Sequence, residues 1–139
     1  MEEIVEQSKI CLNCKNKPCQ NACPLGNNIP DAIKNVKEEN FEEAYKILSK
    51  TSVLQSICGR ICPHFEQCMG NCTRGIKQKP IDIGDIEAFV GDLAIKNTYN
   101  MYELNKDCVN KNVAIVGSGP SRAYLCCIFS KKRGKCNNF

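Results

Sequence analysis

The sequence predicts an all-α domain over residues 1–107, followed over residues 108–139 by a strand–turn–helix segment and a basic tail. Apolar residues recur at helical spacing in three stretches between residues 30 and 97, whereas the β-branched run at residues 112–116 comes late, directly before a glycine-containing turn. Cysteine accounts for 12 of the 139 residues and contributes to the 42% hydrophobic content. The ordinary apolar core is therefore thin, and we expect crosslinks or bound metal to supplement it.

Two helices are predicted in the first half of the chain. The first should begin at Pro30, because proline is favoured in a first helical turn, and Ile33 and Val36 follow three residues apart. Asn40 is expected to end it. The second has apolar residues at spacings of three and four, which are Phe41, Ala44, Tyr45, Ile47 and Leu48. We expect this pair of helices to be scaffold.

A third helix is predicted over residues 83–97. Its apolar stripe comprises Ile83, Ile86, Phe89, Val90, Leu93 and Ala94. Glu87 falls on the edge of this stripe, where its carboxylate would be partly desolvated unless a positive charge or a hydrogen-bond donor meets it. From the helix alone, a side chain that reaches sideways to water and a functional carboxylate both remain open.

Residues 98–111 are expected to be a polar connector, and residues 112–116 a buried strand that ends in Gly117-Ser118-Gly119-Pro120. This arrangement is typical of the start of a dinucleotide-binding unit, in which Gly117 and Gly119 would lie against an FAD pyrophosphate. Arg122 stands where the third glycine is expected, and residues 130–139 contain no acidic residue to bind a ribose. We expect no FAD binding by this chain alone.

Charge and hydropathy exclude several classes of protein. The net charge of +4 comes from the last 32 residues, which hold six Lys or Arg and no acidic residue. The body has no basic stripe interleaved with aromatic residues, which excludes nucleic-acid binding. The longest apolar run, residues 123–129, cannot span a membrane. The start of the chain has three glutamates and no apolar stretch typical of an export signal, so we expect a cytoplasmic protein.

Eight cysteines form two clusters with short spacings. The first has the spacing C-x2-C-x4-C-x3-C-P over residues 11–24, and the second C-x3-C-P-x4-C-x3-C over residues 58–72. A C-x3-C-P ending is typical of bacterial ferredoxin sequences. Structural zinc prefers paired C-x2-C units, of which only one is present, and disulfides are rare in the expected compartment. Iron–sulfur binding is therefore favoured over zinc or disulfides. The single histidine, His64, is expected to be exposed and not a ligand.

The order of CLNCKNKPCQNACP, ICGRICPHFEQCMGNCTRG, KPIDIGDIEAFVGD and VAIVGSGPS resembles a known family. It is similar to the N-terminal di-[4Fe-4S] domain, of the dihydropyrimidine dehydrogenase domain II type, of the glutamate synthase small subunit and related NADPH-dependent flavoprotein oxidoreductases. The resemblance covers about residues 4–121 and implies an α-helical ferredoxin-like fold with two [4Fe-4S] clusters, in front of FAD and NADPH domains. Because the resemblance stops abruptly at Arg122, we expect that the chain is cut short at the start of the FAD domain, either by truncation of the gene or by a frameshift.

The resemblance also implies which residues bind each cluster. One cluster would be held by Cys11, Cys14, Cys19 and Cys72. The other would be held by Cys23, Cys62, Cys68 and a non-cysteine ligand that aligns with Glu87. Cys58 is the alternative to Glu87, because simple counting would assign four cysteines of each segment to one cluster. We favour Glu87 and interpret Cys58 as a packed thiol.

Electron transfer is the function that this resemblance implies. The two clusters would relay single electrons between a flavin and a partner cofactor. The partner would be a flavoprotein domain or subunit, either an FAD- and NADPH-binding module, a large synthase subunit or a ferredoxin-linked protein. The chain has no general base or activated nucleophile in a plausible arrangement, so no catalytic residue is predicted and enzymatic activity of this chain stays open. The alternative is a structural zinc-binding or partner-docking module without redox activity.

Overall fold

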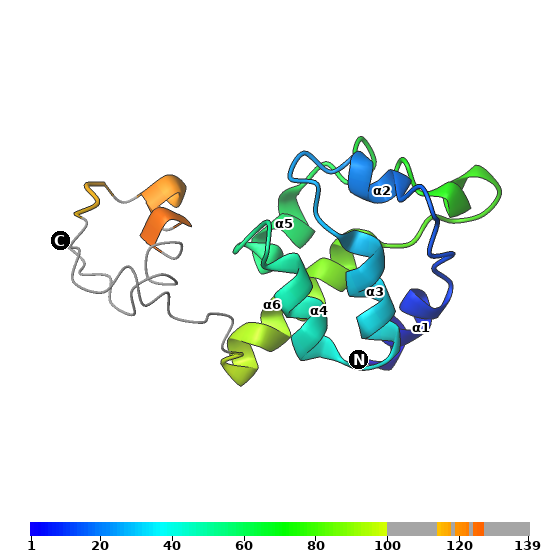
Figure 1. Cartoon of the computed structure of the whole chain (residues 1–139), viewed down its shortest axis with the longest axis horizontal. Coiled ribbons are helices and arrows are strands. Elements are labelled where there is room, and N and C mark those ends of the chain that lie inside the picture. Colours follow the sequence, from blue (N-terminus) through cyan, green and yellow to red (C-terminus); the bar gives the residue numbers. More distant parts are fainter. Residues whose placement is uncertain (100–113, 118, 123, 127–139) are drawn as a thin grey trace. The chain divides into compact units, whose positions relative to one another are not determined.

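The computed structural model describes residues 1–99, 114–117, 119–122 and 124–126. The chain divides into two compact units, Met1–Tyr99 and Asn100–Phe139, which are described separately. The first unit is helical and contains no strand (Figure 1). Its elements are α1 (Glu2–Lys9), α2 (Pro18–Asn21), α3 (Ile29–Lys37), α4 (Phe41–Leu48), α5 (Gln55–Ile61), the 3-10 helix η1 (Thr73–Ile76) and α6 (Ile83–Asn97).

Local sequence signals account for the helix boundaries. Pro30 lies in the first turn of α3, as predicted. Asn40 follows the end of α3 and caps α4, because its side chain accepts a hydrogen bond from the backbone N–H of Glu43. Asp82 caps α6 in the same way, by accepting from the backbone N–H of Asp85. The three predicted helices are thereby confirmed, and α1, α2 and α5 are additions that periodicity did not predict.

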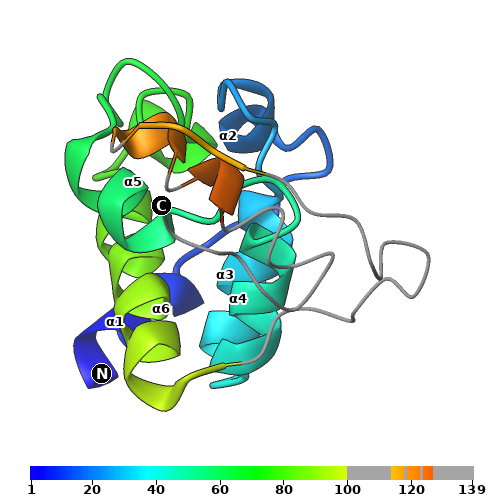
Figure 2. The same cartoon turned by 90° about the vertical axis from the view of Figure 1, so that its left-hand side faces the viewer.

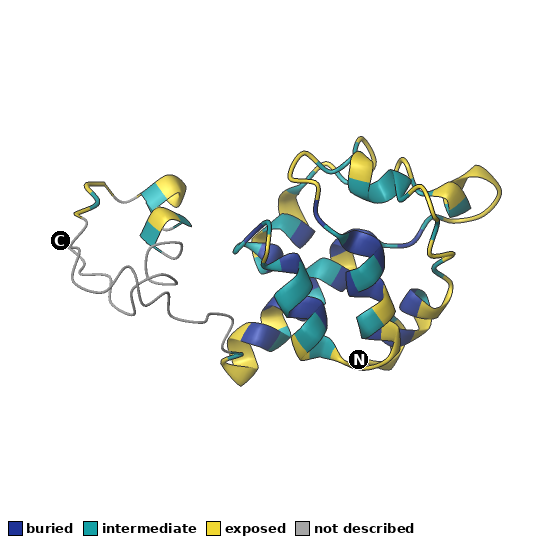
Figure 3. Cartoon of the chain, viewed as in Figure 1, coloured by how far each residue is buried: buried dark blue, intermediate teal, exposed yellow. Residues whose placement is uncertain are grey.

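The core lies between α3, α4 and α6. Val36, Ala44 and Val90, one from each of these helices, have no exposed surface. Buried residues line the facing sides of these helices in Figure 3. Phe41 of α4 and Phe89 of α6 meet edge to face, with ring centroids 5.5 Å apart. This core is small, as the composition predicts, and it leaves the cysteine-rich segments to be organised by other means.

Helices α5 and α6 pack backbone to backbone through glycines. A Cβ atom added to Gly59 of α5 would lie 2.4 Å from the backbone nitrogen of Ala88, and one added to Gly91 of α6 would lie 2.4 Å from that of Ser56. Only hydrogen fits at these positions. This close approach carries the carboxyl end of α5, with Cys58 and Cys62, alongside α6, the helix that carries Glu87.

In the second unit, residues 120–122 and 124–126 are helical, and residues 114–117 have no regular secondary structure. The predicted strand at 112–116 is not shown, since residues 112 and 113 lie outside the described residues and residues 114–116 are not in a strand. A strand needs a neighbouring strand to pair its backbone groups, which a short run cannot supply by itself. Among the described residues, no helix is long and apolar enough to cross a membrane.

Candidate metal centre

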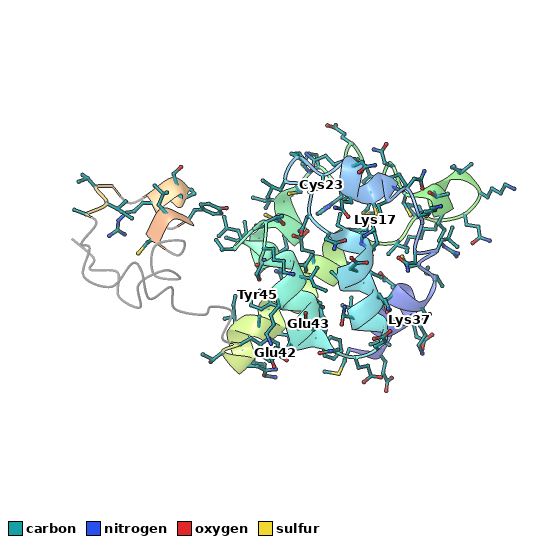
Figure 4. All side chains as sticks on the ribbon, viewed as in Figure 1. Lys17, Cys23, Lys37, Glu42, Glu43 and Tyr45 are labelled. Carbon is teal, nitrogen blue, oxygen red and sulfur yellow. The ribbon has the colours of Figure 1, made fainter. Side chains whose placement is uncertain are left out.

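The two cysteine-rich segments meet at one end of the helical unit. Figures 1 and 2 show α2 and the loops on either side of η1 at the same end, and Figure 4 shows Cys23 there. Four cysteines line one small pocket that is partly open to solvent: Cys11, Cys14, Cys19 and Cys72. The first three come from the first segment and Cys72 comes from the second. The pocket wall is otherwise largely apolar and includes Ile33, Ile81 and Ile83.

Backbone turns bring these cysteines to the pocket. Asn13 and Lys17 have positive φ angles of 46° and 44°, which fold the loop between Cys11 and α2 back on itself. Pro18 then starts α2 and places Cys19 in its first turn. Across the pocket, the Sγ of Cys14 lies 3.3 Å from Oγ1 of Thr73, so the two cysteine-rich segments are in direct contact.

In this first group, burial favours the protonated thiols of Cys11 and Cys19. Burial raises the pKa of Cys11, and it raises the pKa of Cys19 to about 11. Neighbouring thiols add to both shifts, with Cys72 acting on Cys11 and on Cys19. Thiolates crowded in an apolar pocket repel one another, so a cationic centre is required to hold them in the ionised form.

A second group forms around Cys68, which is 5% exposed. Burial, together with the nearby Glu87 and Cys23, raises the pKa of Cys68 to about 12. Burial likewise raises the pKa of Cys62 to about 11, with contributions from Cys58, Glu87 and Cys23. Cys23 and Glu87 thus lie within electrostatic reach of both Cys62 and Cys68, and Cys58 hydrogen-bonds to Cys62.

The Glu87 side chain is partly buried and does not reach sideways to water. Burial raises the pKa of its carboxyl group to about 7. None of the ion pairs found among the described residues involves it. Its polar contact is with Asn27, whose Nδ2 lies 3.5 Å from Glu87 Oε1. This carboxyl group is therefore held close to thiols, with a weak neutral donor in place of a cation.

Cys58, the alternative ligand, also lies next to Cys62. Its Sγ is 3.9 Å from the Oγ of Ser52, a residue that is 3% exposed. Cys58 thus has a hydrogen-bonding neighbour in Ser52. It also lies close enough to the second group to raise the pKa of Cys62. Glu87 and Cys58, the two candidates for the fourth ligand of the second group, therefore both lie near Cys62.

The expectation that His64 is exposed is wrong. Its ring is half-buried, with Nδ1 3.3 Å from the Sγ of Cys68 and Nε2 3.2 Å from the carbonyl oxygen of Gly59. The seven-residue turn 64–70 folds His64 back over Cys68, which the four-residue spacing alone did not reveal. Sequence reasoning likewise missed Asn27 and Thr73, which are polar neighbours of predicted ligands. For Asn27, the only signal in the sequence was that Gly26 and Pro30 lie on either side of it and indicate a loop.

The donor set fits an iron–sulfur cluster, because four thiols from both segments line one pocket. Zinc needs four ligands within about 2.3 Å of one point. A four-iron cluster binds each thiolate through a different iron atom, so its ligands stand farther apart. Sets of sulfur donors gathered loosely around a pocket fit that requirement.

The two glycines of the nucleotide motif are exposed. Gly117 has a φ of 119°, a conformation that favours glycine. A Cβ atom added to Gly117 or Gly119 would meet no atom within 4 Å among the described residues. Their part in binding FAD stays a prediction.

Residues 1–99 match the family described as dihydropyrimidine dehydrogenase domain II, 4Fe-4S cluster. The chain belongs to this family. As a 4Fe-4S domain it is similar to the glutamate synthase [NADPH] small chain of Escherichia coli K12, with 34% identity over 83% of this chain and 24% of that protein. It is 32% identical to the NAD-dependent dihydropyrimidine dehydrogenase subunit PreT of the same strain, over 84% of this chain and 28% of that protein. The glutamate synthase small chain of Azospirillum brasilense is 35% identical over 86% of this chain and 25% of its own length.

Membership in the 4Fe-4S family confirms the resemblance seen in the cysteine spacings, and it supports iron–sulfur binding by this chain. The 4Fe-4S domain spans about a quarter of the length of these curated relatives. The activities in these names, NADPH-dependent glutamate synthase and NAD-dependent dihydropyrimidine dehydrogenase, therefore describe those larger proteins.

Proposed function

We propose that this 4Fe-4S domain is an electron-transfer module that holds two [4Fe-4S] clusters and relays single electrons between a flavin and a partner cofactor. The observation that carries the proposal is the sorting of the predicted ligands into two groups, each of which draws on both cysteine-rich segments. An electron relay needs more than one centre, and the match to a 4Fe-4S family favours iron–sulfur clusters over structural zinc at these two sites.

In this proposal the first cluster is bound by Cys11, Cys14, Cys19 and Cys72, and the second by Cys23, Cys62, Cys68 and Glu87. The case for Glu87 over Cys58 rests on burial and charge. Glu87 is partly buried beside thiols with a single long contact to a neutral amide, so iron would supply the missing positive charge. Cys58 has Ser52 as a polar neighbour at 3.9 Å, which supports its interpretation as a packed thiol, although it also hydrogen-bonds to Cys62.

The protein's part in the relay is to bind the clusters and to make them unequal. When bound, iron–sulfur clusters exchange single electrons at potentials set by ligand type, charge, hydrogen bonding and burial. Glu87 would give one site a carboxylate in place of a thiolate. The apolar wall formed by Ile33, Ile81 and Ile83 would exclude water from the other site. Thr73 would donate a hydrogen bond to the Cys14 sulfur, because a thiolate can only accept.

The proposed partner is a flavoprotein domain or subunit in the cytoplasm. The relatives are longer oxidoreductase chains, of which the match covers about a quarter, so a domain of this kind works beside other modules. We further propose that the domain extends over residues 1–107 and that residues 108–139 begin a dinucleotide-binding unit with a strand, turn and helix.

Paired cysteine substitutions test how the ligands are shared. If the sites are interleaved, Cys11→Ser combined with Cys72→Ser should cost one cluster, about four of eight irons, and Cys68→Ser combined with Cys72→Ser should cost both. If each segment instead binds its own cluster, the first pair costs both clusters and the second pair costs one. Anaerobic reconstitution of the whole chain, followed by iron and sulfide analysis, distinguishes these results.

A further inference from the structure

Asn27 connects the second group of predicted ligands to the scaffold. It is 3% exposed and lies four residues after Cys23, in the loop before α3. Its Nδ2 lies 3.5 Å from Glu87 Oε1, and its Oδ1 accepts a hydrogen bond of 2.9 Å from the Oγ1 of Thr51. A polar side chain so deeply buried needs a partner at each end of its amide, and Asn27 has them in Thr51 and Glu87.

The loop geometry fixes where the amide lies. The carbonyl oxygen of Cys23 accepts a hydrogen bond of 2.8 Å from the backbone N–H of Gly26, and Gly26 has a φ of 61° that favours glycine. This turn directs Asn27 inward, and the backbone N–H of Ile29 then donates to the Asn27 carbonyl oxygen at 2.7 Å. The same turn therefore places both Cys23 and Asn27.

The orientation of the amide follows from what its partners can accept. An ionised carboxylate has only acceptor oxygens, so Asn27 must direct Nδ2 towards Glu87 and Oδ1 towards Thr51. The Thr51 hydroxyl can donate to Asn27 Oδ1, although it also lies 3.3 Å from the carbonyl oxygen of Leu48. At 3.5 Å the contact between Asn27 and Glu87 is long, and it becomes stronger as the carboxylate gains negative charge.

We propose that Asn27 is a positioning residue for the second cluster. Its amide holds Glu87 Oε1 and leaves the other carboxylate oxygen to bind iron. This inference rests on the proposed role of Glu87 as a ligand. Hydrogen bonds to metal ligands orient them and tune the metal centre. A donor on the ligand carboxylate withdraws negative charge, so it should make the cluster easier to reduce than it would be without that donor.

Two substitutions of Asn27 remove the donor in different ways. Asn27→Leu replaces the amide by an apolar side chain of comparable size, and Thr51 can then donate to Leu48. Asn27→Asp keeps the shape and replaces the donor by an acceptor. The matched control is Asn35→Asp, the same chemical change at a half-buried asparagine of α3 whose Nδ2 donates to the carbonyl oxygen of Asp31.

The experiment uses the full chain reconstituted anaerobically, with iron analysis, circular dichroism and a redox titration followed by electron paramagnetic resonance. We expect both Asn27 variants to lower the midpoint potential of one cluster, or to lose the iron of that cluster alone with helicity unchanged. The other cluster and the Asn35→Asp control should keep the wild-type potentials. Unchanged potentials in both Asn27 variants, or equal shifts of both clusters, would overturn the role of Asn27. A wild-type chain that takes up no iron would instead reject the proposed function, before any variant is compared.

Discussion

At the scale of single residues, the account depends on a carboxylate and a thiol that compete for one ligand position. Glu87→Ala should remove the iron of one cluster, about four of eight irons, and spare the other cluster. Cys58→Ser should change the iron content little, because Ser52 already accounts for the polar contact of Cys58. Iron and sulfide analysis of the two variants in parallel checks this. The reverse result, with iron lost in Cys58→Ser and kept in Glu87→Ala, would assign the position to Cys58.

Among single residues, the sequence could predict only those whose residue type already indicates what they bind. Cysteine spacing predicted the donor atoms, and the helical wheel placed Glu87 at the edge of an apolar stripe. Asn27, Thr73 and His64 were missed because each acts through a contact with a residue distant in the chain or across a tight turn. An amide or hydroxyl has no distinctive signal until the fold brings it to its partner.

At the scale of elements, the glycine contact between α5 and α6 is the most constrained feature. Gly91→Ala would place a Cβ atom 2.4 Å from the backbone nitrogen of Ser56, so the helices must separate. Such overpacking costs about 1–3 kcal/mol, against about 1 kcal/mol gained from the better helix propensity of alanine. We expect a lower melting temperature by several degrees, measured by circular dichroism.

The control for that substitution is Gly75→Ala in η1. The added Cβ atom would lie 3.4 Å from the Cβ of Pro80, which is an ordinary contact. Gly75→Ala should therefore leave the melting temperature nearly unchanged. Equal stability of the Gly91→Ala and Gly75→Ala proteins would show that α5 and α6 are not in backbone contact.

A pH-dependent contact also joins these two helices. The Arg60 guanidinium of α5 and the Ser56 hydroxyl lower the pKa of Asp92 of α6 by hydrogen bonding, and Arg60 Nη2 lies 2.5 Å from Asp92 Oδ2. A lowered carboxyl pKa contributes stability above the unfolded pKa of about 3.9, and this stability is lost as the pH falls through the folded pKa. Asp92→Asn should lower the melting temperature slightly at pH 7 and have a smaller effect near pH 3. A larger loss at pH 3 than at pH 7 would contradict the pairing.

Helix periodicity predicted α3, α4 and α6 because each has an apolar stripe. It did not predict α5, whose buried side is made of Gln55 and Gly59 in place of large apolar residues. The glycine and alanine positions of α6 that face α5 were likewise invisible to a hydrophobicity pattern. The strand predicted at 112–116 is not shown by residues 114–116, because a strand depends on pairing that a local sequence cannot guarantee.

At the scale of the whole molecule, the proposed clusters would add to the stability that the apolar core gives the helical unit. The apolar core joins α3, α4 and α6, whereas the end that carries the cysteines has crowded thiols and a partly buried carboxyl group. Binding that occurs only in the folded state adds to its stability. Removing iron with a chelator under reducing, anaerobic conditions should therefore lower the melting temperature. A melting temperature that does not change on iron removal would contradict a structural role for the clusters.

Binding of two iron–sulfur clusters by both cysteine-rich segments together can be measured by metal and sulfide analysis of the whole chain after anaerobic reconstitution, together with its visible absorption spectrum. We expect a brown protein with about eight irons and eight sulfides per chain, as two four-iron clusters require. A colourless protein that binds zinc, or no metal at all, would contradict this expectation.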